Sequence, residues 1–119
     1  MKNKIIITII IIIINIFCGN YENSISGNIY DSITKEPIPQ ANVAIYNAFN
    51  GEATNLITTI ETDEDGYYYY SDDVFVVFNG ECGLVLALVV TKTGYQDYTG
   101  NFKTECSDLI QDISLIPLE

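Results

Sequence analysis

From residue 24 to the end of the chain, apolar and polar side chains alternate with a period of two, and β-branched and aromatic residues dominate. This alternation is typical of β-strands with one buried face, because successive side chains of a strand point to opposite sides of a sheet. Clusters of Asp, Asn, Gly and Pro interrupt the alternation every few residues, as expected for turns. The pattern therefore predicts an all-β domain.

Four strands are predicted in the first half of this region. Three of them have a clear inward face, formed by Ile25, Gly27 and Ile29, by Ala41, Val43 and Ile45, and by Leu56, Thr58 and Ile60. Residues 31–40 are predicted as a loop with two prolines and residues 47–55 as a polar connection. Residues 67–70 are predicted as a fourth strand, which the aspartates at 72 and 73 break. No place in the fold is predicted for residues 74–78.

The second half begins with an apolar run at residues 84–90, which predicts a central strand covered on both faces. Gly94 marks a tight turn into a returning strand at residues 95–103, and residues 109–115 form the last strand. The inward positions of these two strands are Tyr98 and Phe102, and Ile113 and Leu115. Together the segments predict an antiparallel Greek-key β-sandwich of about seven strands.

The first 17 residues have the layout of a signal peptide, with two lysines followed by an apolar run from Ile5 to Phe17. This run is shorter than the roughly 20 residues that span a bilayer. We therefore expect residues 1–17 to be a signal peptide, residues 18–24 a polar tether, and residues 25–117 the folded domain. A short anchor that is never cleaved is the alternative.

Cys18 directly follows the apolar run, where bacterial lipoproteins carry the cysteine that is diacylated. Phe17 departs from the small residue usual before that cysteine, so an ordinary leader that contains a cysteine is the alternative. Lipidation at Cys18 predicts a lipoprotein anchored to the membrane at the cell envelope. Without it, the exported protein is expected to be secreted or periplasmic.

The charge of the chain is strongly negative, with 5 basic residues, 16 acidic residues and a formal net charge of −11. Loss of a leader that holds Lys2 and Lys4 leaves 3 − 16 = −13. Such a field repels phosphate backbones, so nucleic-acid binding is excluded. Histidine and arginine are absent, which removes the commonest general base and the commonest transition-metal ligand. We therefore predict no enzyme activity, no catalytic residue, no cofactor and no metal site.

Two short motifs have both a functional and a structural interpretation. Asp63, Glu64 and Asp65 could supply oxygen ligands to Ca²⁺, but the same residues beside Gly66 are typical of a turn, and we favour the turn. Residues 67–70 are four consecutive tyrosines, so two rings are expected in the core and two at the surface. Exposed tyrosines suit binding surfaces, although strands are also rich in tyrosine for packing reasons.

Cys82 and Cys106 are predicted to form a disulfide, on the basis of hairpin register. If the strands on either side of Gly94 pair, opposed residues have numbers that sum to about 187, or to 188 for a three-residue loop. The sum 82 + 106 = 188 places both cysteines opposite one another at the open end of that hairpin. The alternatives are two unpaired buried cysteines, or a reducing environment that keeps both as thiols.

An ordered series of landmarks resembles the carboxypeptidase regulatory-like domain, a prealbumin-like (transthyretin-like) β-sandwich, over nearly all of the mature chain. The matching positions are Gly27 to Asp31, Thr34, Pro37 and Ile38, Ala41 to Ile45, Thr62 and Asp63, Asp65 to Tyr67, Lys92 to Tyr95, and Ile113 to Leu115. The resemblance implies an accessory folding or docking module, with peptidase chemistry in a separate domain. Two departures are Gln40, where glycine usually precedes the alanine, and a longer segment at residues 70–83.

These observations lead to one functional hypothesis and two alternatives. We expect a monomeric, non-catalytic module at the cell envelope that binds an envelope protein or a glycan. The first alternative is a hydrolase or carbohydrate-active protein that uses acidic residues alone. The second is an inhibitor or immunity-type protein whose acidic surface binds a basic partner.

Overall fold

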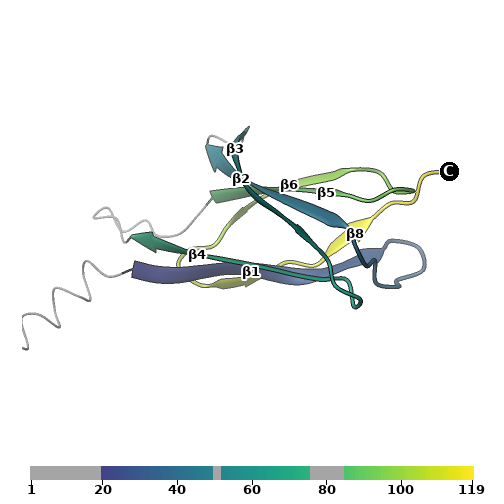
Figure 1. Ribbon diagram of the computed structural model, residues 1–119, viewed down its shortest axis with the longest axis horizontal. Coiled ribbons are helices and arrows are strands. Elements are labelled where there is room, and N and C mark those ends of the chain that lie inside the picture. The colour runs from purple at the N-terminus through teal and green to yellow at the C-terminus, as the bar shows by residue number, and fades with distance from the viewer. Residues whose placement is uncertain (1–19, 50–51, 76–84) are drawn as a thin grey trace, which may run out of the picture.

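The computed structural model describes residues 20–49, 52–75 and 85–119, and all regular structure in these segments is β. Two four-stranded sheets pack face to face (Figure 1). The prediction of an all-β sandwich is therefore confirmed. The strands are β1 (Asn20–Asp31), β2 (Asn42–Phe49), β3 (Glu52–Glu61), β4 (Tyr67–Phe75), β5 (Val85–Thr91), β6 (Tyr98–Lys103), β7 (Asp108–Ile110) and β8 (Ile113–Leu115).

The first sheet, called sheet 1 below, is built around β1. On one side β1 pairs with β4 in antiparallel fashion, and on the other side β7 and β8 follow one another along it in parallel fashion. The expectation of a purely antiparallel sandwich was wrong for these two short strands. After β6 the chain crosses to the other sheet and then runs beside β1 in the same direction, which makes the pairing parallel.

The second sheet, called sheet 2 below, has the order β3-β2-β5-β6 and is antiparallel throughout. The predicted central position of the apolar run is confirmed, because β5 pairs with β2 on one side and β6 on the other. The chain passes between the sheets after β1, β3, β4 and β6, as in a Greek-key sandwich.

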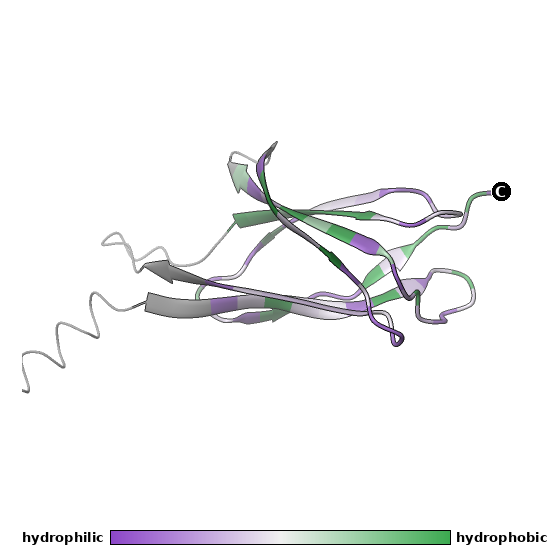
Figure 2. Ribbon diagram, viewed as in Figure 1, coloured by the Kyte–Doolittle hydropathy of each residue, from purple (hydrophilic) through white to green (hydrophobic). Residues whose placement is uncertain are grey.

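The hydrophobic core lies between the two sheets and is formed by residues that alternate along their strands. Figure 2 shows hydrophobic residues along β1, β2, β5 and β8. The predicted inward positions of the first, second and last strands are all buried, and Tyr98 and Phe102 pack against the core from β6. The fully buried side chains include Ile25, Ile29, Val43, Ile45, Tyr68, Leu86, Leu88, Val90, Ile113 and Leu115.

The third strand differs from its prediction because of a β-bulge. Ile45 pairs with Thr58 but the next residue of β2, Tyr46, pairs with Leu56, so Ile57 is the extra residue. A bulge of one residue reverses the facing of everything beyond it. Leu56 was expected inside and is instead 55% exposed, while Ile57 packs against the core.

Three further expectations of irregular structure were wrong, because backbone pairing continues through polar residues. Most of the predicted connection at residues 47–55 is strand, since β2 and β3 pair as far as Phe49 and Glu52. The predicted break at Asp72 and Asp73 is also strand, since both residues pair with β1. Residues 20–24, expected in the tether, begin β1, where Asn23 and Ser24 are buried.

The turns follow their predictions more closely. Gly66 and Gly94 both have positive φ, 75° and 91°, as expected for glycine in a tight turn. Gln40 also has a positive φ of 56°, so the backbone keeps a glycine-like conformation where the sequence lacks glycine. In the segments that the structure describes, no helix is long and apolar enough to cross a membrane.

Candidate functional site

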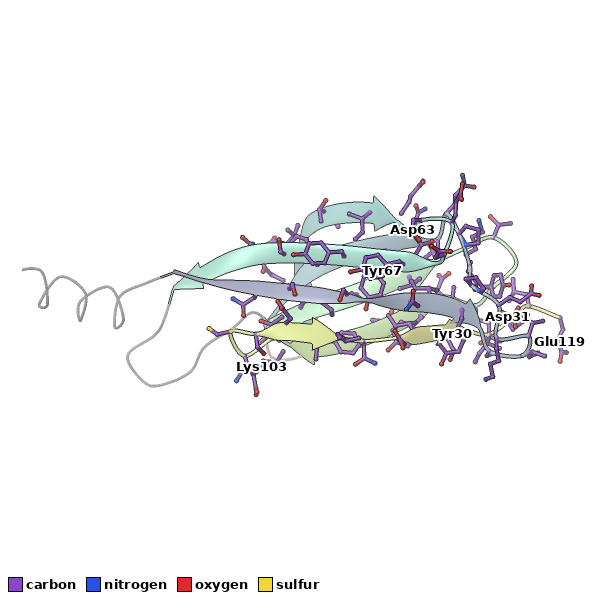
Figure 3. The ribbon with its side chains drawn as sticks, turned by 90° about the horizontal axis from the view of Figure 1, so that it is seen from below. Tyr30, Asp31, Asp63, Tyr67, Lys103 and Glu119 are labelled. Carbon is purple, nitrogen blue, oxygen red and sulfur yellow. The ribbon has the colours of Figure 1, made fainter. Side chains whose placement is uncertain are left out.

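The outer side of sheet 1 carries a row of exposed side chains that crosses three strands. Tyr69 of β4 and Ile110 of β7 both pair with Ser26 of β1, so the three residues lie side by side. Tyr69 is 49% exposed and Ile110 is 75% exposed. Tyr67, which is labelled in Figure 3 and is 40% exposed, precedes Tyr69 by two residues and so lies on the same side of the strand. We call this surface, made of Ser26, Asn28, Tyr67, Tyr69 and Ile110, the tyrosine face.

The other two tyrosines of the run point inward and fix β4 in place. Tyr68 is buried, and its hydroxyl donates to the Gln111 carbonyl oxygen at 2.6 Å. Burial raises the pKa of the Tyr68 hydroxyl well above its usual range. The Tyr70 hydroxyl donates to Oδ2 of Asp72 at 3.0 Å, and burial followed by this hydrogen bond raises its pKa to about 12. The predicted division of two rings inside and two outside is confirmed.

Sheet 1 has acidic residues and no basic ones. Its four strands contain Glu22, Asp31, Asp72, Asp73 and Asp108, and neither lysine nor arginine occurs in them. The three lysines of the described segments lie elsewhere, Lys35 in the loop after β1, Lys92 after β5 and Lys103 at the end of β6. The two sheets therefore differ in charge, and the tyrosine face lies on the more acidic one.

The acidic turn before β4 is explained by hydrogen bonds within the turn. Oδ1 of Asp63 accepts from the backbone N–H groups of Asp65 and Tyr67, both at 2.9 Å. Gly66 supplies the positive φ that closes the turn. Within the described part of the chain, no three His, Cys, Asp or Glu side chains are grouped so that they could hold a metal ion. The turn interpretation accounts for Asp63 without calcium.

The structure also contains a buried carboxylate that was not singled out from the sequence. Asp31 ends β1, and its Oδ1 accepts from the backbone N–H groups of Ile33 and Thr34 at 2.8 and 2.9 Å. Its Oδ2 accepts from the Tyr95 hydroxyl at 2.8 Å. The backbone hydrogen bonds from Thr34 and Ile33, and then that from Tyr95, hold the pKa of Asp31 below its usual range. This carboxylate joins the loop after β1 to the β5–β6 turn.

A polar hollow of about 340 Å³ lies at the same end of the molecule and was likewise missed. It is lined by Gln40, Asn42, Thr91, Lys92, Thr93 and Asp97. Lys92 Nζ donates to the Gln40 carbonyl oxygen at 3.5 Å, which is a long contact. The lining has one cation and one carboxylate but no pair of carboxylates. One sequence feature pointed to this hollow. Gln40 stands where the resembled family usually has glycine, and in the structure it is a residue with positive φ that lines the hollow.

The predicted cysteine sites fall largely outside the described residues. Cys18 and Cys82 are not among the residues that the structure describes, whereas Cys106 lies in the turn that follows β6. The register that underlies the predicted disulfide is present, because Val85 pairs with Lys103, and every β5–β6 pair sums to 188. The Cys82–Cys106 bond itself stays a prediction, as do the signal peptide at residues 1–17 and lipidation of Cys18.

Comparison with known proteins finds similarity only among solved structures, since no family model and no curated protein matches the chain. Catechol 1,2-dioxygenase from Acinetobacter radioresistens is 14% identical with a TM-score of 0.63, over 85% of this chain and 53% of that one. 3-Chlorocatechol 1,2-dioxygenase from Rhodococcus opacus 1CP is 12% identical with a TM-score of 0.59, over 82% of this chain and 61% of that one. The C-terminal domain of the shaft pilin SpaA from Lactobacillus rhamnosus GG is 17% identical with a TM-score of 0.57, over 82% of this chain and 98% of that domain.

These similarities concern the fold alone. The chain spans between about half and three fifths of the length of the dioxygenase structures, at 53% and 61%, whereas it covers nearly all of the pilin domain. Sandwich domains with such different roles share an architecture without sharing a site. The comparisons therefore identify the chain as a β-sandwich compatible with the transthyretin-like type.

Proposed function

We propose that this chain is an exported, non-catalytic β-sandwich module that binds a protein or glycan partner at the cell envelope. The tyrosine face is the observation that carries this proposal. Its two tyrosines and Ile110 present apolar area on a regular sheet, with the polar residues Ser26 and Asn28 between them. Tyrosine gives a binding surface a large, rigid contact area at low entropic cost, and it can also donate a hydrogen bond.

The chemistry of the described residues supports binding rather than catalysis. The chain has no histidine to activate its serines, threonines or cysteines, and the polar hollow has a single carboxylate, Asp97. The most strongly held polar groups, Asp31 and Tyr68, are hydrogen-bonded to the backbone and stabilise the fold. A module of this kind matches the resemblance to the carboxypeptidase regulatory-like domain, which implies a docking role.

The position of β1 supports a membrane-proximal arrangement. β1 begins at Asn20, two residues after Cys18, and the C-terminus lies at the opposite end of the sandwich (Figure 1). Lipid on Cys18 would therefore hold the sandwich by one end. The tyrosine face, on the side of the sandwich, would then stay accessible to a partner in the envelope.

The test compares variants of the tyrosine face with matched variants elsewhere. In one variant Tyr67→Ser and Tyr69→Ser are combined, and in the control Leu56→Ser and Ile33→Ser remove exposed apolar side chains outside sheet 1. Each protein is applied to a glycan array and used to capture proteins from the envelope of its host. Binding that is lost in the first variant and kept in the second supports the proposal, whereas equal binding by both contradicts it.

A further inference from the structure

We propose that the free edge of β4 binds an extended, basic segment of a partner protein as an added β-strand. This inference rests on the proposed binding function and names its partner class. Adding a strand to an exposed sheet edge is a recurring mode of peptide recognition, in which main-chain hydrogen bonds supply affinity and side chains supply specificity. Three observations on β4 support it: an edge without the usual protection, main-chain groups that face away from β1, and negative charge.

β4 is the edge strand with the most regular pairing. Its nine residues pair with β1 in one unbroken register, and among the described residues no strand lies on its other side. Proteins usually protect edges with bulges, lysines, prolines or short strands. The other edges have such protection, since β3 contains two register shifts, β6 ends in Lys103, and β7 and β8 have three residues each. β4 has no bulge, lysine or proline.

Hydrogen bonds at the start of β4 reveal which of its main-chain groups face outward. The Tyr67 N–H and carbonyl both bond to Asp63 rather than to β1, at 2.9 and 3.1 Å. In an antiparallel pair, residues that bond to the neighbouring strand alternate with residues that do not. Tyr69, Ser71 and Asp73 therefore direct their N–H and carbonyl groups away from β1, where no described strand pairs with them, so a new strand can bond to these groups.

Charge selects the occupant of this edge. The edge strand contains Asp72 and Asp73, follows the turn with Asp63, Glu64 and Asp65, and belongs to a sheet without lysine or arginine. The β4 edge of a second copy would add two more aspartates and no basic residue, so repulsion disfavours self-pairing. A strand with lysine or arginine opposite Asp72 would instead form favourable cross-strand pairs. The added strand would also lie beside Tyr69 and extend the tyrosine face.

The deciding variant is Ser71→Pro in the full chain. Because the Ser71 N–H points away from β1, proline at this position removes one donor of the free edge and leaves the β1–β4 ladder complete. Ser71→Ala keeps the donor and serves as the matched control. The probe is a peptide of alternating lysine and threonine as long as β4, measured by fluorescence anisotropy. Two further peptides carry glutamate in place of lysine, or N-methyl groups on alternate amides.

We expect the lysine peptide to bind wild type and Ser71→Ala alike, and to bind Ser71→Pro about tenfold more weakly. The glutamate and N-methylated peptides should not bind. Equal binding to Ser71→Pro, equal binding of the N-methylated peptide, or no binding of the lysine peptide would overturn the proposal. So would dimerisation of the wild type that Ser71→Pro abolishes, because the edge would then serve a second copy.

The same variants separate this inference from the proposed function. If capture of an envelope partner requires Tyr67 and Tyr69 but is unchanged in Ser71→Pro, the tyrosine face binds and the edge inference fails. If neither set of variants changes capture, both proposals fail. Circular dichroism of Ser71→Pro confirms that it is folded, and amide exchange at Tyr69 and Asp73 reports on the edge directly.

Discussion

At the scale of single residues, the structure depends on a few positions where backbone and side chain are tightly constrained. Gln40 adopts a left-handed φ that costs a non-glycine residue about 1–2 kcal/mol. Thr62 is buried beside it, donating to the Ile38 carbonyl oxygen at 2.7 Å and accepting from the Ala41 N–H at 2.9 Å. These contacts hold the entry to β2 in place, and the strain at Gln40 persists because its neighbours fix it.

Replacement of Gln40 by glycine is therefore expected to stabilise the protein. Glycine relieves the strain but gains entropy in the unfolded chain, so the net gain in the free energy of unfolding is about 0.5–1 kcal/mol. Urea denaturation with an unchanged m-value measures it. Gln96→Gly is the control, since Gln96 is exposed and has no positive φ, and it should destabilise slightly. A Gln40→Gly protein less stable than wild type would contradict this explanation.

Asp31 predicts how stability depends on pH. Its pKa is lowered in the folded state, so its contribution is present above the ordinary value of 3.8 and is lost as the pH falls through the folded value. Tyr95→Phe removes one donor, so the folded pKa of Asp31 should rise and acid destabilisation should begin at a higher pH. An NMR titration of the Asp31 carboxyl measures this shift, with Tyr98→Phe as the control. An unchanged pKa in Tyr95→Phe would show that the hydroxyl has no part in it.

At the scale of elements, hydrophobic periodicity predicted most strands but could not predict where pairing ends. Inward positions such as Ile25, Val43 and Ile113 were correct, because alternation directly reports a buried face. The facing of Leu56 was wrong, because a bulge depends on the partner strand and leaves no mark in the local pattern. The parallel pairing of β7 and β8 depends on the path of the whole chain. The tyrosine face could be predicted only in part, since Ile110 joins it through β1.

The junction of β1 with the C-terminal strands predicts a strong effect at Gly27. A Cβ at this position would overlap the backbone carbonyl of Gln111, whose N–H donates to the Ser26 carbonyl oxygen at 2.7 Å. Because the backbone at Gln111 would have to move to make room for this Cβ, Gly27→Ala should lower the free energy of unfolding by about 1–3 kcal/mol. At Gly100 a Cβ would meet the outer atoms of the Tyr98 and Phe102 rings, so Gly100→Ala should cost less. Thermal denaturation ranks the two variants, and the opposite order would contradict the described packing.

The β5–β6 hairpin predicts the disulfide. The described β5–β6 pairs sum to 188, as do the positions of Cys82 and Cys106, and a bridge between these two residues would stabilise the domain by about 3 kcal/mol. Mass spectrometry of non-reduced, proteolysed protein from its native host should show the two cysteine peptides linked. Alkylation of both as free thiols would refute the bond.

At the scale of the whole molecule, the two sheets differ in composition, and the proposed export would expose this difference to partners outside the cell. If Cys18 is diacylated, a fatty-acid label should enter the wild type and not Cys18→Ser. Labelling of both proteins, or of neither, would end the anchor hypothesis. An envelope protein with the sandwich held at one end would present both outer faces to neighbours, and only sheet 1 combines exposed tyrosines with uncompensated negative charge.

Site-specific photo-crosslinking in the native envelope tests the central claim most directly. A photoreactive phenylalanine analogue replaces Tyr69 on sheet 1 or, in a separate protein, Leu56 on sheet 2, which is similarly exposed. The proposed function predicts a discrete crosslinked partner from position 69 and none of comparable yield from position 56. The same adducts from both positions, or adducts from position 56 alone, would contradict a binding role for the tyrosine face.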